Sequence, residues 1–295
     1  MSGADGAQTN TDLPNPISSL LSTPTALQWA DRLLNAAGIE DARFEAQLLL
    51  ALALNVSRTT LLAGLRPTLS ETEFRAFEAL ARERERRVPL AYLRGTQEFY
   101  GLPFLVTPAT LIPRPETELL VEFALEKSPT LLADVGTGTG CIPIAVLAHC
   151  PQARAVAFDL SFEALAVARR NAIANNVMDR LRLVQGNILR GAGGMFDLLV
   201  SNPPYIPSEE IDGLQAEVRD FEPRLALDGG RDGLTLLREL AQEARRVLKP
   251  GGWLAVEVAL GQASVVAELF AARGLTAIAA RRDLAGIERI VCGQI

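Results

Sequence analysis

The stretch "NPPY", residues 202 to 205, follows an apolar run, "FDLLVS", that has the composition of a buried strand. Two consecutive prolines remove two backbone donors and fix two φ angles, so the chain leaves the sheet as a rigid, extended segment. The Asn202 side-chain oxygen and the Pro203 main-chain carbonyl are hydrogen-bond acceptors, Pro204 stiffens the segment, and Tyr205 offers a flat face. These residue types predict a rigid wall that positions a ligand.

A glycine-rich loop, "DVGTGTG", follows another short apolar run at residues 134 to 140. Glycine allows a sharp turn and a close backbone approach to a ligand where a Cβ would collide. The spacing is not that of dinucleotide-binding loops, and no Lys-Ser/Thr pair of a phosphate loop is present. We expect a loop for a nucleoside without phosphates, with helix packing as the structural alternative. Its residues are Gly136, Thr137, Gly138, Thr139 and Gly140.

Two further positions complete a candidate nucleoside site. Asp159 ends the next apolar run, where an acidic side chain accepts hydrogen bonds from both ribose hydroxyls, although it could instead cap the helix starting at Ser161. Asn187, in "VQGNIL", is suited to the polar edge of adenine and Ile188 to its ring face. A turn-forming Gly-Asn pair is the alternative for Asn187.

The elements that position these motifs alternate between β-type and helical stretches. β-type runs occupy 131–135, 153–159, 181–185, 196–201 and 252–258, and helical stretches occupy 142–150, 161–176 and 233–248. This alternation predicts an α/β domain with right-handed βαβ units and an open, mostly parallel sheet. Ligands of such sheets bind beyond the carboxyl ends of the strands, which is where every motif above lies.

The N-terminal part has a different, helical pattern. Thr23 and Pro24 are typical of a helix start, and Ser70 with Glu73 forms a capping box ahead of another helix. A segment rich in Pro, Gly and aromatic residues then predicts a β-hairpin. We therefore expect a disordered tail at 1–19, an all-helical domain at 20–87, a hairpin linker at 88–112 and the cofactor-binding domain at 113–295.

Composition narrows the class of protein. The 295 residues are 48% hydrophobic. No apolar run approaches the length of a membrane span, roughly 18 residues, and the polar start has no signal-peptide core. We expect a cytoplasmic enzyme without a membrane partner.

The net charge of −6 argues against a broad nucleic-acid face, so no direct sequence-specific nucleic-acid partner is expected. Three cysteines without C-x-x-C spacing argue against disulfides and structural zinc, and no metal is expected.

The combination of "NPPY" and "GTGTG" resembles the S-adenosylmethionine-dependent methyltransferases that alkylate a planar, conjugated nitrogen. This resemblance implies a class I, Rossmann-like fold and S-adenosylmethionine as cofactor, with S-adenosylhomocysteine as product. It places Asn202, Pro203, Pro204 and Tyr205 at the target, with Asn202 also bordering the cofactor. The glycine loop, Asp159, Asn187 and Ile188 hold the cofactor.

Four longer segments sharpen the resemblance. They are residues 86–122, 196–207, 217–234 and 282–291, and they are similar to the peptide chain release factor N5-glutamine methyltransferase family from about residue 24 to 292. The implied substrate is the glutamine of the Gly-Gly-Gln loop of release factors. On this resemblance, the N-terminal helices and the hairpin dock the protein substrate.

Three charged residues form a second tier of candidates. Arg114 and Glu116 lie in "IPRPETE", which the resemblance places near the methionine end of the cofactor, and Glu257 ends the fifth predicted strand. Acidic residues at the start of a helix are also favourable for the helix itself, which is the structural alternative for Glu116.

The chain departs from the family pattern at Asn187, where an acidic residue is usual, at Ala259, where glycine is common, and at Phe158. Three alternatives remain open. A glutamine methyltransferase of a large-subunit ribosomal protein shares both motifs. A nucleic-acid adenine N6-methyltransferase also uses "NPPY" but should carry a basic groove. A non-catalytic docking module should have lost Asn202 or the glycines.

Overall fold

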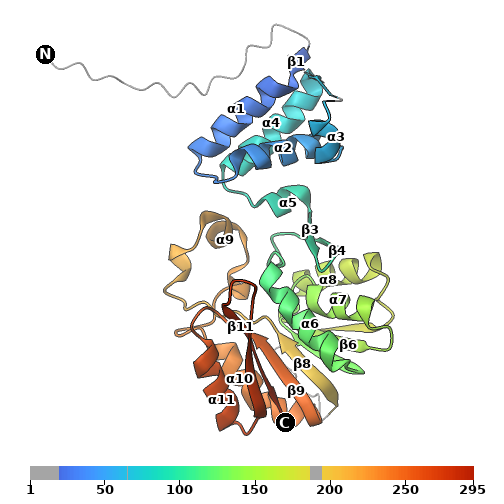
Figure 1. The fold of residues 1–295 in the computed structure, drawn as a ribbon, viewed down its shortest axis with the longest axis vertical. Coiled ribbons are helices and arrows are strands. Elements are labelled where there is room, and N and C mark those ends of the chain that lie inside the picture. The colour runs from blue at the N-terminus through green and yellow to red at the C-terminus, as the bar shows by residue number, and fades with distance from the viewer. Residues whose placement is uncertain (1–19, 65, 187–194) are drawn as a thin grey trace, which may run out of the picture. The chain divides into compact units, whose positions relative to one another are not determined.

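The computed structural model describes residues 20–64, 66–186 and 195–295, which form two compact units that divide between Arg94 and Gly95 (Figure 1). No helix in these three ranges is both long and apolar enough to cross a membrane.

The first unit is a small helical domain. Its helices are α1 (Thr23–Ala36), α2 (Ala42–Ala53), α3 (Arg58–Leu62), α4 (Glu71–Glu85) and α5 (Leu90–Arg94). A short antiparallel pair, β1 (Leu20–Ser22) and β2 (Thr68–Ser70), was not expected from the sequence. Buried side chains of α1, α2 and α4 form the core, where the Trp29 ring meets Phe74 and Phe77 edge-on.

Helix starts in this unit follow local side-chain chemistry. The predicted capping box of Ser70 and Glu73 is present at the start of α4. The prediction at α1 was displaced by one residue: Ser22 is the N-cap, and its hydroxyl accepts from the Thr25 N–H at 3.2 Å. Both residue types satisfy the free N–H groups of a first turn, so composition alone does not distinguish them.

The second unit begins with the hairpin β3 (Thr96–Phe99) and β4 (Leu102–Leu105). The strands are shorter than the segment 88–112, because residues 90–94 are helical. Buried Asn171 fastens the hairpin to the rest of the unit. Its amide accepts from the Leu105 N–H at 2.7 Å and donates to the Leu105 carbonyl at 3.0 Å and the Thr139 carbonyl at 2.9 Å.

A seven-stranded sheet forms the centre of the described part of this unit, in the order β10-β11-β9-β8-β5-β6-β7. The strands are β5 (Leu131–Val135), β6 (Arg154–Asp159), β7 (Leu181–Gln185), β8 (Phe196–Ser201), β9 (Leu248–Glu257), β10 (Thr276–Arg282) and β11 (Glu288–Gln294). β5 to β9 are parallel, and β10 and β11 are antiparallel. The predicted α/β fold with a mostly parallel sheet is confirmed, whereas the final antiparallel hairpin was not predicted.

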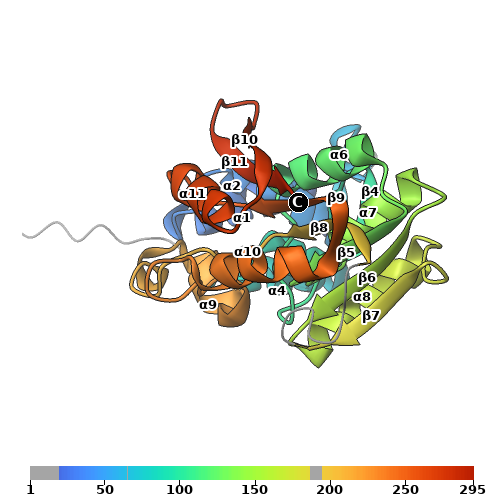
Figure 2. The same ribbon diagram turned by 90° about the horizontal axis from the view of Figure 1, so that it is seen from below.

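Helices cover both faces of the sheet (Figure 2). α6 (Glu118–Lys127), α7 (Cys141–His149) and α8 (Phe162–Ala174) pack on one face, and α10 (Thr235–Val247) and α11 (Ala263–Ala272) pack on the other. Shorter helices complete the unit: α9 (Ala216–Phe221) and the 3-10 turns η1 (Pro115–Thr117), η2 (Ile211–Gly213) and η3 (Arg224–Ala226). The strand order changes direction at β5, between β6 and β8. Such a switch point opens a crevice at the carboxyl ends of the strands.

Candidate active site

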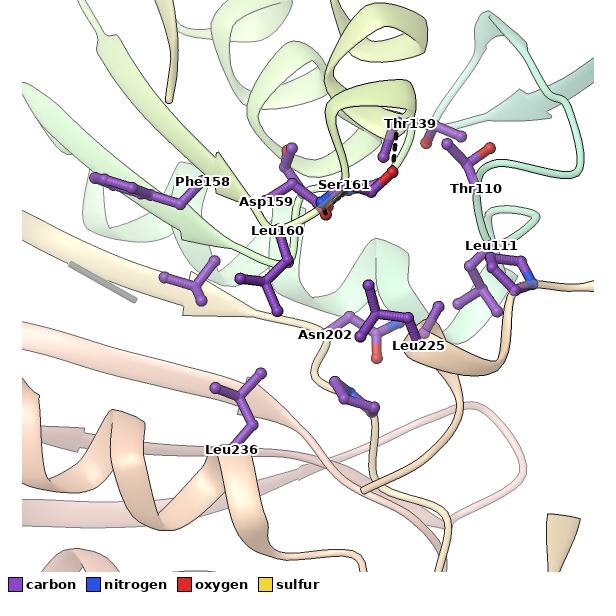
Figure 3. A pocket seen from close by; sticks show the side chains of 18 of the residues that line it. Thr110, Leu111, Thr139, Phe158, Asp159, Leu160, Ser161, Asn202, Leu225 and Leu236 are labelled. Atoms are coloured by element: carbon purple, nitrogen blue, oxygen red, sulfur yellow. Dashed lines mark hydrogen bonds between the residues drawn. The ribbon is translucent and has the colours of Figure 1, made fainter. Parts of the chain in front are cut away.

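A cavity of about 440 Å³ lies at this switch point. Its walls come from the glycine loop after β5, the end of β6, the segment after β8, residues 109–117 and residues 223–239. Figure 3 shows Asp159 and Asn202 at the cavity, which Leu225 and Leu236 also border. The crevice thus brings together motifs that stand far apart in the sequence.

The glycine loop is held by the neighbouring strand. The N–H groups of Gly136 and Thr137 both donate to the Phe158 carbonyl, at 2.9 and 3.0 Å. Gly140 has a φ of +79°, and a Cβ there would lie 2.9 Å from Ile144 Cδ1 in α7. The loop therefore needs glycine at position 140 for conformation and for helix packing, while residues 136 to 139 line the cavity.

Asp159 connects the loop to the start of α8. Its Oδ2 accepts from the Gly138 N–H at 2.9 Å, and its Oδ1 accepts from the Ser161 N–H at 2.9 Å. Ser161 is the N-cap of α8, because its hydroxyl accepts from the Ala164 N–H at 3.0 Å. The capping role considered for Asp159 thus belongs to Ser161, and a carboxylate has lone pairs left after two such bonds.

Asp134 is buried beneath the glycine loop. Neither carboxylate oxygen of Asp134 nor the Thr137 hydroxyl has a hydrogen-bond partner within bonding geometry among the described residues. Buried polar groups are normally paired. Burial raises the pKa of Asp134 to about 7; the nearby Thr137 hydroxyl opposes this shift, and the charge of Asp159 adds to it. Asp134 lies outside the cavity lining and its oxygens are buried, so its charge can act on a cationic part of a cofactor only at a distance.

We expect Asp134→Asn to stabilise the ligand-free protein at neutral and alkaline pH. The folded-state pKa of about 7 lies above the ordinary 3.8, so wild-type stability is lost as the pH rises through this interval. The amide has no such ionisation cost. Thermal unfolding at a series of pH values should give Asp134→Asn a higher melting temperature than the wild type at pH 8. This difference in melting temperature should vanish toward pH 4. A difference independent of pH would show that Asp134 does not titrate in this range.

Asn202 follows β8 and is half-buried in the cavity wall. Its Nδ2 donates to the Thr117 hydroxyl at 3.0 Å. No described residue donates to Asn202 Oδ1 or to the Pro203 carbonyl. Neither acceptor named from the sequence is thus occupied by a described residue, but only Asn202 lines the cavity, whereas Pro203 is buried and lies outside its lining.

The backbone of the "NPPY" segment is held from two sides. The Gln262 side chain donates to the Tyr205 carbonyl at 3.0 Å and accepts from the Ala259 N–H at 3.0 Å. Gly229 and Gly233 pack on the segment: added Cβ atoms would lie 2.7 Å from the Pro204 carbonyl and 2.2 Å from the Tyr205 carbonyl, respectively. These contacts with backbone leave little freedom for the wall to move.

We expect Gly233→Ala to destabilise the protein by about 2 to 4 kcal/mol and to lower activity. The reason is that the backbone met by the new Cβ cannot yield, and that the φ of Gly233 is +72°. Urea unfolding measures the loss of stability. Gly213→Ala is the matched control, since Gly213 is exposed and nothing lies within 4 Å of its added Cβ. Equal stability of the two variants would contradict this packing role.

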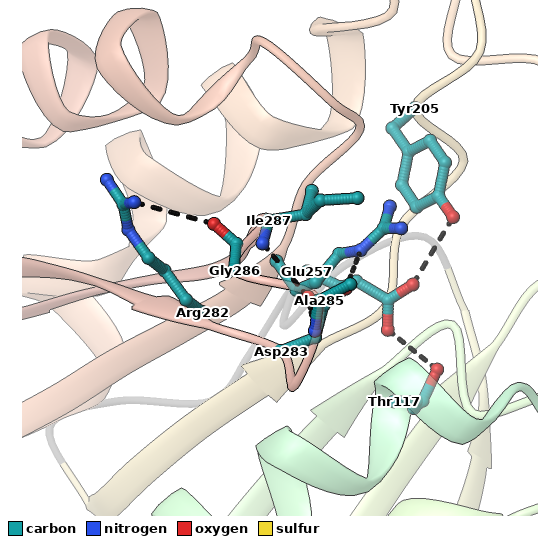
Figure 4. Close-up of polar contacts among 9 residues, drawn as sticks. Thr117, Tyr205, Glu257, Arg282, Asp283, Ala285, Gly286 and Ile287 are labelled. Atoms are coloured by element: carbon teal, nitrogen blue, oxygen red, sulfur yellow. Dashed lines mark hydrogen bonds and ion pairs between the residues drawn. The ribbon is translucent and has the colours of Figure 1, made fainter.

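The second-tier residues occupy different places. Arg114 lines the cavity and forms an ion pair with buried Glu222, which also accepts from the Ile112 N–H at 3.0 Å. Glu257 is buried behind the cavity, where it accepts from the Thr117 hydroxyl at 2.6 Å and the Tyr205 hydroxyl at 3.2 Å (Figure 4). Burial raises the pKa of Glu257 to about 7.

The structure therefore gathers many, but not all, of the residues named from the sequence. Those that line the cavity are Arg114, Gly136, Thr137, Gly138, Thr139, Asp159, Asn202 and Pro204. Those outside its lining are Gly140, Pro203, Tyr205, Glu116 and Glu257. Asn187 and Ile188 lie outside the described residues.

Sequence reasoning missed the supporting residues Thr117, Asn171, Glu222 and Gly233. Thr117 stands in "IPRPETE" and Gly233 in "DGGRDGL", two segments that were singled out as motifs. Both segments were recognised as motifs, but only the charged residues of the first segment were considered as candidate site residues. Their contacts join residues that are distant in the chain, in the case of Thr117 and Glu257 by 140 positions, which no local pattern reports.

Known proteins resemble this chain over most of its length. The family models "PrmC N-terminal domain" and "Methyltransferase small domain" match residues 25–95 and 115–218. The release factor glutamine methyltransferase of Geobacter sulfurreducens is 43% identical over 91% of this chain and 95% of its own. That of Caulobacter vibrioides is 44% identical over 89% and 92%. A methyltransferase from Pyrococcus furiosus shares the fold at 20% identity, with a TM-score of 0.51 over 74% of this chain and 96% of that chain.

Proposed function

The chain belongs to the release factor glutamine methyltransferase family, and we propose that it methylates the side-chain nitrogen of the glutamine in the Gly-Gly-Gln loop of release factors. The protein is a methyltransferase that acts on a release factor glutamine with S-adenosylmethionine as methyl donor. The similarity to release factor glutamine methyltransferases over most of the chain carries the loop proposal, and Asn202 Oδ1 supplies an unoccupied acceptor at the cavity for the glutamine amide.

The residues of the cavity fit the cofactor. S-adenosylmethionine supplies an electrophilic methyl group on a sulfonium. Asp159 would accept from the ribose hydroxyls, and the negative charge of Asp134, buried next to the glycine loop, would favour the cationic methionine end without touching it. Arg114, oriented by Glu222, would bind the methionine carboxylate. Gly136 has a φ of +73°, which favours glycine, whereas a Cβ there would meet the Asn202 carbonyl only at an ordinary contact distance of 3.9 Å.

Asn202 and Pro203 perform the activation. The lone pair of an amide nitrogen is delocalised into the carbonyl and is a poor nucleophile. Two acceptors that each take one N–H of the glutamine favour pyramidalisation and direct the lone pair toward the methyl group. No strong base is needed, because the nitrogen proton becomes acidic only after the methyl group has moved. The rigid Pro203–Pro204 backbone keeps the two acceptors in place without reorganisation.

The remaining roles concern the protein substrate. We assign docking of the release factor to the helical first unit and the β3–β4 hairpin, with no direct sequence-specific contact to nucleic acid. The net charge of −6 supports the second part of this assignment, because a nucleic-acid face needs a concentration of positive charge.

Transfer of labelled methyl from S-adenosylmethionine to purified, unmethylated release factor tests the proposal. The control is the same factor with the loop glutamine replaced by alanine, and ribosomal proteins of the large subunit serve as competing substrates. We expect label on the intact factor alone. Label on both forms of the factor, or on a ribosomal protein alone, would refute the Gly-Gly-Gln assignment.

A further inference from the structure

We propose that Thr117 and Glu257 are positioning residues that determine which end of the Asn202 amide faces the substrate glutamine. The inference rests on the proposed function of Asn202. It adds a chain of hydrogen bonds from Asn202 through Thr117 to Glu257, called the relay below, that fixes the orientation of the Asn202 amide. Thr117 lines the cavity but is 2% exposed, and its hydroxyl is engaged by Asn202 and Glu257, while Glu257 is outside the cavity lining.

The relay is a chain of hydrogen bonds between three segments far apart in the sequence. Asn202 Nδ2, after β8, donates to Thr117 Oγ1 in η1 at 3.0 Å. Thr117 Oγ1 donates to Glu257 Oε2, at the end of β9, at 2.6 Å. Tyr205 donates to the other oxygen of Glu257 at 3.2 Å (Figure 4). Asn202 is thus connected to a buried carboxylate through a single hydroxyl.

The direction of these hydrogen bonds follows from which groups carry a proton to donate. An ionised carboxylate only accepts, so the one hydroxyl proton of Thr117 is committed to Glu257. The Thr117 oxygen can then only accept from Asn202, which requires the amide nitrogen, and not the amide oxygen, to face Thr117. The Asn202 oxygen is left on the other side of the amide, free of any donor from the described residues.

The opposite orientation would be inactive. A rotated Asn202 would present its NH₂ group to the glutamine NH₂, placing donors against donors and removing one of the two acceptors. An asparagine amide alone has nearly the same shape in both orientations, so packing distinguishes them poorly. The hydrogen-bond chain supplies the discrimination that shape does not.

Charged groups around Glu257 determine when the relay operates. Burial dominates its raised pKa, Glu116 in η1 raises it further, and Arg289 on β11, paired with Asp283, lowers it. Burial also raises the pKa of Tyr205, so its phenol stays a donor. A protonated Glu257 can donate to Thr117, which then donates to the Asn202 oxygen and reverses the relay. With a Glu257 pKa of about 7, activity should fall as the pH drops below about 7.

Isosteric substitutions separate this role from a purely structural one. Glu257→Gln keeps the shape but introduces a donor, and Thr117→Val removes the hydroxyl. We expect each to lower kcat by roughly 10- to 100-fold and to leave the cofactor dissociation constant within a few-fold. Thr117→Ser, which keeps the hydroxyl, should restore most of the activity lost in Thr117→Val. At saturating S-adenosylmethionine, where the titration of Asp134 does not limit cofactor binding, Glu257→Gln should also lose the acidic limb of the pH profile of kcat.

The double variant Thr117→Val/Glu257→Gln should be no worse than the poorer single variant, because both interrupt one chain. Multiplicative losses would overturn the inference, as would wild-type kcat in Thr117→Val. The wild-type pH profile is a test that requires no variant to fold, and a rate constant that does not fall between pH 8 and 6 contradicts the relay.

A spectroscopic readout keeps this inference separate from the proposed function. In protein with ¹⁵N-labelled asparagine, the Asn202 side-chain NH₂ should exchange slowly with solvent, and Thr117→Val should accelerate its exchange while Thr117→Ser should not. This result would support the relay even if release factors proved not to be the substrate. Rapid exchange in the wild type would overturn the relay even if release factors were methylated.

Discussion

Asn202→Ala should lower the turnover of release factor by about a thousandfold, the upper range for loss of one preorganised polar contact to a transition state. The variant loses the side-chain acceptor for the glutamine N–H while Pro203 and the cavity stay in place. Its cofactor dissociation constant should remain within a few-fold of the wild type, because the proposed cofactor contacts lie in other segments.

Single-turnover kinetics and calorimetry together measure this effect. The first reports the chemical step without product release, and the second reports cofactor affinity. Asn202→Asp is a useful companion, because it retains acceptor oxygens but brings a second carboxyl beside the Thr117–Glu257 chain. A loss of cofactor affinity as large as the loss of rate would reassign Asn202 to cofactor binding.

Asp159→Ala should have the second largest effect, on cofactor affinity. Hydrogen bonds to a charged group contribute about 1.5 to 3 kcal/mol each, so the loss of two such bonds to the ribose should raise the dissociation constant by about 100-fold or more. The rate constant at saturating cofactor should change much less, because Asp159 does not contact the target nitrogen in the proposed arrangement. Calorimetric titration with S-adenosylhomocysteine gives the affinity directly.

Ser161→Ala is the matched control for Asp159. It removes the N-cap of α8, a loss of about 1 kcal/mol in stability, but leaves the Asp159 carboxylate at the cavity. If Asp159→Ala only lowered stability, as Ser161→Ala should, Asp159 would be limited to holding Gly138 and Ser161 together.

The sheet was largely predictable from the sequence. The runs at 131–135, 181–185 and 196–201 coincide with β5, β7 and β8. β5 and β8 are mostly buried and have the mainly apolar sequence of central parallel strands, whereas β7 is an edge strand that mixes apolar and polar residues. The order of these strands in the chain and the position of the glycine loop then predict where the ligand-binding crevice lies. The β10–β11 hairpin was missed, since β10 lies at the sheet edge and is largely exposed, so it lacks this apolar pattern.

Only those residues of the candidate site that stand at or directly after strand ends were predictable from the sequence. Asn202, Asp159 and the glycine loop follow strand ends, so local pattern and sheet geometry suffice to bring them together. Thr117 gains its role only from Asn202 and Glu257, which lie 85 and 140 positions away. Tyr205 was expected to present a flat face to the substrate. Its hydroxyl instead bonds to Glu257, and that substrate contact stays a prediction.

The most direct test of the account is a crystal structure of this protein with S-adenosylhomocysteine and a release factor. We predict that the side-chain nitrogen of the Gly-Gly-Gln glutamine lies within hydrogen-bond distance, about 2.7 to 3.2 Å, of both Asn202 Oδ1 and the Pro203 carbonyl. The cofactor ribose should lie on Asp159. A glutamine bound elsewhere in the cavity, or an Asn202 amide whose nitrogen faces the glutamine, would contradict the account.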